Sequence, residues 1–332
     1  MDLRATTVGL FPLPDEQRAR LVGMDRRGGE SENGAGESGD ETAVFDAARK
    51  GVIAVQEDAG LDLVVEGQTR WEDVLAHPLS VHENVSPGGV VRYYDNNNFY
   101  REPVVVGELG PSGDLAADLG AAGELTDRLQ AVVPGPYSLA DLARNEYYVD
   151  DVAFLDAVAE FLAGELASVS ASVECVFLLD PSLVTNPPDD DAHERVSEAV
   201  DAVARAVDAP AVVHTCWGAP GEKLHAHLLD ADVSALGYDL VSAHEEATYL
   251  VQEYGTAESV SLGLVDGQNT LVEDAETIRE RLRWFRESVP VSEFETVYVT
   301  PNTGLFYLPV SRFEAKLRSL GDATERPIEA TR

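Results

Sequence analysis

Residues 173–179 read VECVFLL, and residues 211–215 read AVVHT. Both are short runs rich in β-branched and other apolar residues, which predicts two buried strands. In the segment between them, Asp191–Val207, apolar residues recur three or four positions apart, which predicts an amphipathic helix. A strand, a helix and a second strand in this order are typical of a parallel β/α unit.

The same alternation continues on both sides of this unit. Val152–Ser168 and Ala275–Ser288 show the same helical spacing of apolar residues. No G-x-G-x-x-G motif follows the first predicted strand of the chain, which disfavours a dinucleotide-binding sheet. Eight strands with helical crossovers predict a (β/α)8 TIM barrel, whose chemistry lies after the carboxyl ends of its strands. The predicted strands are Arg4–Leu10, Leu61–Glu66, Gln130–Val133, Val173–Leu179, Ala211–Thr215, Asp239–Ala243, Val260–Val265 and Thr296–Val299.

We expect residues 1–332 to form one domain, because α/β barrels reach this length as single units. Residues 24–43 are rich in Gly, Ser and Glu and predict an acidic loop. Residues 79–106 form a long excursion after the second predicted strand, and both a substrate-covering loop and a surface hairpin are compatible with it. Residues 321–332 are expected to be a disordered tail.

The chain is strongly acidic: 60 acidic and 24 basic residues give a formal net charge of -36. This charge argues against nucleic acid or a membrane as partner. Lys50, Lys223 and Lys316 are the only lysines. The balance is typical of a salt-adapted protein of a halophilic archaeon, and without a secretory signal pattern at the start we expect a cytoplasmic location.

Two strand ends carry candidate metal ligands. His214 and Cys216 follow the fifth predicted strand and point to the same side of it, where imidazole and thiolate together suit zinc. A buried thiol beside a hydrogen-bonded histidine is the alternative interpretation. After the sixth predicted strand, only one of His244 and Glu245 can face the barrel mouth, and Glu246 is placed to begin a helix.

These residues resemble a known family. His214 and Cys216, the acids after the sixth strand, and the loop TPNTGL at 300–305 are similar to the zinc site of cobalamin-independent methionine synthases. The resemblance implies a zinc site formed by His214, Cys216 and Glu245, with His244 as the alternative to Glu245. Thr303 stands where that family has a second cysteine.

The resemblance extends to substrate-binding positions. Val8, Gly9 and Leu10 lie in a stretch that resembles the family's homocysteine-binding entry strand. The resemblance implies that Gln68 stands where the family has a glutamate that binds the substrate amino group. Asp180 remains in an acidic motif in which Leu179 replaces an aspartate that also binds this amino group. The candidate substrate-binding positions are therefore Val8, Gly9, Leu10, Gln68 and Asp180.

The loop after the seventh strand carries the candidate catalytic residues, Asp266 and Gln268. Asp266 matches the family's loop. Gln268 stands where the large bacterial enzymes have a proton-relaying histidine.

The family resemblance implies that zinc activates the thiol of homocysteine, which takes a methyl group from a methyl-pterin or a methyl-corrinoid protein to form methionine. The chain resembles the short archaeal form with a single barrel. One alternative is a uroporphyrinogen-decarboxylase-like corrinoid methyltransferase that uses another small thiol. The other is a weakly catalytic paralogue that acts as the subunit of a sister barrel with an intact site.

Overall fold

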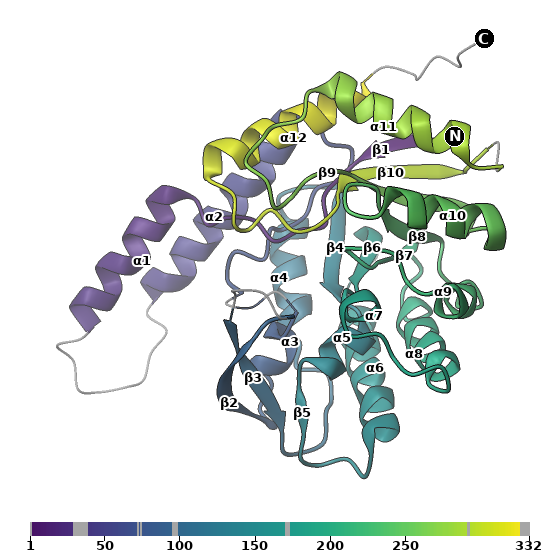
Figure 1. Ribbon diagram of the computed structural model, residues 1–332. Coiled ribbons are helices and arrows are strands. Elements are labelled where there is room, and N and C mark those ends of the chain that lie inside the picture. The colour runs from purple at the N-terminus through teal and green to yellow at the C-terminus, as the bar shows by residue number, and fades with distance from the viewer. Residues whose placement is uncertain are drawn as a thin grey trace.

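The computed structural model describes residues 2–28, 39–71, 73, 75–94, 99–169, 173–290 and 293–325. Its main sheet is curled, and its seven strands run parallel in the order β1-β10-β9-β8-β7-β6-β4 (Figure 1). These strands are β1 (Asp2–Ala5), β4 (Leu129–Pro134), β6 (Val173–Leu179), β7 (Ala211–His214), β8 (Ala235–Asp239), β9 (Ser259–Val265) and β10 (Thr296–Pro301).

The expected second strand lies between the two edges of this sheet. The amides of Asp62 and Leu63 donate to the Ala5 carbonyl of β1, over 2.9 and 3.3 Å. On the other side, Val64 forms a parallel bridge with Leu129 of β4. Residues 61–66 therefore hydrogen-bond to both edge strands, although they form no strand of their own.

Helices cover the outside of the curled sheet, as Figure 1 shows. β4 and β9 are buried along their whole length, as expected for parallel strands that are covered on one face and packed into a core on the other. The helices are α1 (Asp15–Gly28), α2 (Gly39–Asp58), α3 (His77–Ser80), α4 (Asp114–Gly123), α5 (Pro136–Asp141), α6 (Asp151–Ala167), α7 (Ser182–Thr185), α8 (His193–Ala204), α9 (Glu222–Leu228), α10 (His244–Tyr254), α11 (Ala275–Ser288) and α12 (Val310–Thr324).

The helix predictions are largely confirmed. α6, α8 and α11 lie where the apolar spacing predicted helices. Asp150 and Asp274 cap two of them, because their side chains accept hydrogen bonds from the backbone amides three residues later. Among the described helices, none is both long and apolar enough to cross a membrane.

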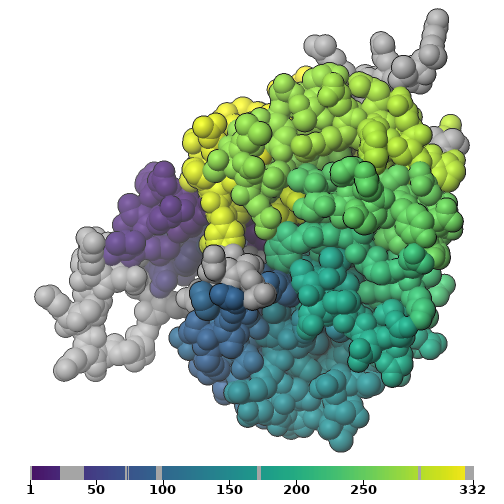
Figure 2. All heavy atoms as spheres, in the orientation of Figure 1, coloured from purple at the N-terminus to yellow at the C-terminus, as the bar shows by residue number. Residues whose placement is uncertain are grey.

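Two segment boundaries differ from the prediction. The expected acidic loop 24–43 is helical at both ends, since α1 continues to Gly28 and α2 begins at Gly39; residues 29–38 lie outside the described part. α1 and the start of α2 project from the body of the molecule (Figure 2). At the other end, α12 continues to Thr324, so only residues 326–332 of the expected tail lie outside the described residues.

The excursion after residue 79 is an antiparallel hairpin. β2 (Val85–Arg92) pairs with β3 (Phe99–Val105), and β3 also pairs in parallel with the short β5 (Arg144–Asn145). Just after β2, the ring of Tyr93 lies 6.3 Å from that of Trp217, which belongs to the loop after β7. The hairpin is therefore a surface element whose residue Tyr93 reaches the carboxyl end of β7.

The boundaries of two further predicted strands differ from the structure. β1 ends at Ala5, whereas Arg4–Leu10 was predicted. The sixth strand was expected at Asp239–Ala243, but β8 spans Ala235–Asp239 and the expected segment forms the turn into α10. The run ALGYD contains a glycine and few β-branched residues, so its sequence gives a weak strand signal. Because of this shift of four residues, the acid at the carboxyl end of the sixth strand is Asp239.

Candidate functional site

A small cavity lies at the carboxyl ends of the strands. Its volume is about 90 Å³, enough for several water molecules or one small ligand. The described residues that line it include Leu10, Leu179, Cys216 and Thr303, which lie at or after the carboxyl ends of four different strands. The place agrees with the position of active sites in α/β barrels.

Backbone strain is concentrated around this cavity. Among the described residues, five non-glycine residues have positive φ angles, between 45° and 61°: Leu10, Gln68, Tyr94, Cys216 and Trp217. Three of them line the cavity, Gln68 hydrogen-bonds to Leu10, and Tyr94 packs against Trp217. Such conformations cost about 1–3 kcal/mol each and persist where function requires them.

His214, the last residue of β7, is fully buried. Its Nε2 donates to the Asn302 carbonyl over 3.0 Å, which leaves Nδ1 buried without a hydrogen-bond partner. Burial lowers the pKa of His214, so the imidazole is neutral at neutral pH. Gly237 of β8 leaves the space that this ring occupies, because a Cβ there would lie 2.2 Å from Nδ1.

Cys216 lies two residues beyond His214, with its thiol beside Thr303. Burial raises the pKa of the Cys216 thiol, and the charge of Asp239 raises it further. A hydrogen bond with the Thr303 side chain acts in the opposite direction. The thiol is therefore uncharged at neutral pH in these surroundings.

Asn302 connects the loops that follow four strands. Its side-chain amide donates to Asp239 Oδ2 over 3.0 Å, and its Oδ1 accepts from the Gly267 amide over 2.9 Å. Its carbonyl accepts from His214. Asp239 is buried, and its Oδ1 also accepts from the amides of Val241 and Ser242.

The structure does not bring the predicted third ligand to His214 and Cys216. Glu245 is exposed in the first turn of α10, and the ring of His244 packs 5.3 Å from that of Trp284 on α11. The acid at the carboxyl end of this strand is its last residue, Asp239. Our prediction placed β8 four residues too late and therefore selected residues of the following helix.

The residues present do not form a zinc site. His214 has the required second contact to a carbonyl and a free Nδ1, and Cys216 is adjacent in the strand-to-loop turn. Thr303 offers a hydroxyl instead of a thiolate, and Asp239 is already hydrogen-bonded through both oxygens. No group of three His, Cys, Asp or Glu side chains in the described residues could hold a metal ion. Zinc takes about four ligands, and this arrangement supplies two.

Residues 8–10, after β1, are hydrogen-bonded to Gln68. Val8 is buried, and Gly9 and Leu10 both have positive φ angles. The Leu10 amide donates to Gln68 Oε1 over 2.8 Å, and Gln68 Nε2 donates to the Val132 carbonyl over 3.1 Å. Gln68 therefore fixes the backbone at the rim of the cavity.

Asp180 also has a structural environment. It is fully buried, and its carboxylate accepts from the amides of Tyr137 and Ser138 and from the Ser138 hydroxyl. Burial raises the pKa of Asp180 to about 7. It holds the turn after β4, while Leu179 lines the cavity in its place.

The candidate catalytic residues lie in the loop after β9. Asp266 is partly buried, and its Oδ1 accepts from the Gln268 amide over 2.9 Å. Gln268 is exposed and lines the cavity. Glu273 accepts from the Asp266 amide and pairs with buried Lys316 over 2.6 Å, which connects this loop to α12.

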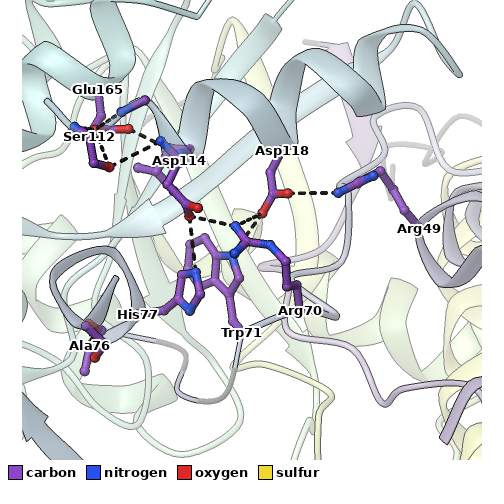
Figure 3. Close-up of polar contacts among 12 residues, drawn as sticks. Arg49, Arg70, Trp71, Ala76, His77, Ser112, Asp114, Asp118 and Glu165 are labelled. Carbon is purple, nitrogen blue, oxygen red and sulfur yellow. Dashed lines mark hydrogen bonds and ion pairs between the residues drawn. The ribbon is translucent and has the colours of Figure 1, made fainter. Parts of the chain in front are cut away.

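Sequence reasoning missed a charged cluster around Arg70, in the loop before α3, which Figure 3 draws. Arg70 lies between Asp114 and Asp118 of α4, at 2.7 and 2.8 Å. Asp118 also pairs with Arg49 of α2 over 2.8 Å, and His77 stacks on Trp71 with ring centroids 4.8 Å apart. The cluster anchors the loop that carries Gln68 and Asp73 to two helices.

Comparison with known proteins identifies the family. A family described as "Cobalamin-independent synthase, Catalytic domain" matches residues 3–326. The chain belongs to the cobalamin-independent synthase family. Methionine synthase of Saccharolobus solfataricus is 25% identical over 333 residues, covering 97% of this chain and 94% of the relative. That of Sulfolobus acidocaldarius is 24% identical over 314 residues, covering 92% and 87%.

Solved members of the cobalamin-independent synthase family have a similar fold. The B12-independent methionine synthase of Shewanella sp. W3-18-1, in complex with selenomethionine, superimposes with a TM-score of 0.80 at 17% identity, covering 98% of this chain and 97% of that one. A putative vitamin-B12-independent methionine synthase from Listeria monocytogenes superimposes with a TM-score of 0.69 at 18% identity, covering 95% of this chain and 94% of that one. These likenesses support the α/β fold.

Proposed function

We propose that this chain transfers a methyl group to the thiol of homocysteine and so forms methionine. The observation that carries the proposal is the cavity beside Cys216 at the carboxyl ends of the strands, in a chain that the cobalamin-independent synthase family matches over nearly its full length. In this reaction the thiol loses its proton and forms a sulfur–carbon bond to the methyl group. The bond between that methyl group and a pterin nitrogen or a corrinoid cobalt breaks.

The chain's own residues shape the place of this reaction. Trp217 and Tyr93 cover the cavity and limit the access of water to it. The His214–Asn302 hydrogen bond fixes the loops around Cys216. Asp266 holds the turn that presents Gln268 at the rim, where an amide can hydrogen-bond to a donor or product.

His214 and Cys216 are the two residues that could contribute to zinc binding. We expect the zinc affinity of this chain to be well below that of a complete four-ligand site, because Thr303 and the hydrogen-bonded Asp239 do not supply thiolate or free carboxylate. The incomplete site also favours a second candidate function. In this second function, the chain is the partner subunit of a sister barrel, and the sister barrel carries the cysteine that this chain lacks.

We also infer that the curled sheet closes into an eight-stranded barrel through residues 61–66. The hydrogen bonds of this segment to Ala5 on one side and to Arg128 and Gln130 on the other support closure. Such a barrel would be a single domain, with the cavity at its mouth.

The function is tested by methionine formation from homocysteine with either a methyl-pterin or a methyl-corrinoid as donor. We expect activity in the parent and at least a tenfold loss in Cys216→Ala. Cys175→Ala is the matched control, because Cys175 is the other buried cysteine and lies in β6, outside the cavity lining. A folded parent that forms no methionine with either donor contradicts the proposal, and activity that appears only with a sister barrel supports the subunit function.

A further inference from the structure

The cavity contains a carboxylate that the sequence comparison did not select. Asp73 lines it together with Cys216 and Thr303, and it is the only acidic residue among the described lining residues. It lies in the loop between residue 67 and α3, whereas Cys216 and Thr303 lie in the loops after β7 and β10. The cavity thus has a thiol at one part of its lining and a carboxylate at another.

The positions expected to bind a substrate amino group do not offer a free carboxylate. Gln68 is neutral, and its amide group bonds to the backbone of Leu10 and Val132. Leu179 is apolar, and the oxygens of Asp180 are occupied by the turn after β4. A cationic ligand in the cavity would therefore have no charged partner at those positions.

Asp73 has an oxygen available for a ligand. Its Oδ1 accepts from the amides of Leu75 and Ala76, over 3.0 and 2.8 Å. Its Oδ2 has no hydrogen-bond partner among the described residues. The loop is held on its outer side by Arg70, which pairs with Asp114 and Asp118 (Figure 3). The position of Asp73 is therefore fixed by the protein before any ligand binds.

Aromatic rings surround the same space. Tyr93, Phe99, Trp217, Phe306 and Tyr307 all line the cavity. Burial raises the pKa of Tyr93 and of Tyr307, and the Asp73 charge contributes to both shifts, so the two hydroxyls lie within electrostatic reach of Asp73. A carboxylate among aromatic faces is suited to an ammonium group, which gains an ion pair and cation–π contacts.

We infer that Asp73 binds the ammonium group of an amino-thiol substrate whose sulfur lies beside Cys216 and Thr303. This inference deepens the proposed function, on which it rests, because homocysteine is such an amino thiol. Asp73 takes the role that Gln68 and Leu179 cannot fill. It selects for a primary amine on the substrate and against thiols that lack one.

The test is calorimetric titration, at one KCl concentration, with L-homocysteine and with 4-mercaptobutanoic acid, which has the same thiol and carboxylate but no amine. We expect the parent to bind homocysteine about 10- to 100-fold more tightly, as for a hydrogen bond to a charged group. Asp73→Asn keeps a carbonyl for the Leu75 and Ala76 amides. It should lose this preference while binding 4-mercaptobutanoic acid as the parent does.

Asp190→Asn is the control, because Asp190 is an exposed aspartate that pairs with Lys223 on the surface. It should behave like the parent. The inference is overturned if Asp73→Asn leaves the preference for homocysteine unchanged. It is also overturned if Asp73→Asn weakens the binding of both ligands equally, because this result would give Asp73 a structural role only.

A thiol-free pair separates this inference from the proposed function. If the parent forms no methionine but binds L-2-aminobutanoic acid more tightly than butanoic acid, and Asp73→Asn abolishes the difference, Asp73 is an ammonium-binding residue in a protein of another activity. If methionine is formed and Asp73→Asn leaves KM for homocysteine unchanged, the function stands and the role of Asp73 is rejected.

Discussion

At the residue scale, Thr303 stands where the family resemblance implies a second cysteine. Its side chain hydrogen-bonds with the Cys216 thiol, and Asn302 fixes its loop. A hydroxyl is a poor zinc ligand compared with a thiolate, so His214 and Cys216 are left without a strong third partner.

Restoring a thiolate at this position should increase zinc binding. We expect Thr303→Cys to raise zinc affinity by about 10-fold or more, because it adds a soft ligand next to Cys216. Thr303→Ser is the control, since it keeps the hydroxyl. Zinc content after dialysis against a competing chelator measures the effect. Equal zinc content in the parent and in Thr303→Cys would show that residue 303 does not face the metal position.

Asp180 gives a prediction about pH. Its pKa is raised by burial from 3.8 to about 7, so the folded state binds a proton that the unfolded state releases. Its contribution to stability is therefore complete below about pH 4 and is lost as the pH rises through 7.

Asp180→Asn should remove this loss. Between pH 5 and pH 7, the free energy of unfolding of the parent should fall relative to the variant by up to about 1.4 kcal/mol per pH unit. Urea unfolding of both proteins at each pH measures the difference between their free energies of unfolding. The contributions of the other acidic residues are the same in both proteins and cancel in this difference. Parallel pH curves would mean that Asp180 is ionised throughout.

At the scale of elements, α4 depends on a residue of another helix. Its N-cap is Gly113, which has no capping side chain. Glu165 of α6 replaces it, because its carboxylate accepts from the amides of Ser112, Gly113 and Leu115. α4 in turn carries the two aspartates that hold Arg70, so this cap supports the loop of Asp73.

Removing the cap should destabilise the protein. We expect Glu165→Ala to lower the free energy of unfolding by about 2–3 kcal/mol, since it leaves the buried Leu115 amide and two neighbouring amides without their acceptor. Glu160→Ala, at an exposed site on the same helix, should change it by less than about 0.5 kcal/mol. Denaturant unfolding of the two variants checks this, and an equal effect would exclude a special role for Glu165.

The elements also show why part of the site could be predicted and part could not. His214 and Cys216 were found because a continuous apolar run marks β7, and the end of a strand can be read locally. Asp239 was missed because the run ALGYD has little β-branched character, so its end was placed four residues late. Asp73 and the Arg70 cluster were missed because their contacts join residues 44 to 48 positions apart in the chain, or more, which no local pattern encodes.

At the scale of the whole molecule, the dominant property is the net charge of -36. Many of the described ion pairs are exposed, such as those of Arg144 with Glu146 and of Arg195 with Glu198, and pairs of this kind contribute little in water. The folded chain therefore concentrates negative charge that the unfolded chain can spread out. Salt should stabilise the fold by screening this repulsion.

Removal of surface charge should replace part of the effect of salt. Asp189 and Asp191 are exposed on either side of Asp190, in the loop before α8. We expect Asp189→Asn/Asp191→Asn to raise the free energy of unfolding by about 0.5 kcal/mol at 0.1 M KCl, because it removes adjacent like charges. At about 2 M KCl the difference should vanish, since screening then acts over about 3 Å or less. Thermal unfolding at both concentrations measures this; a gain that is equal in both would come from local structure and not from charge.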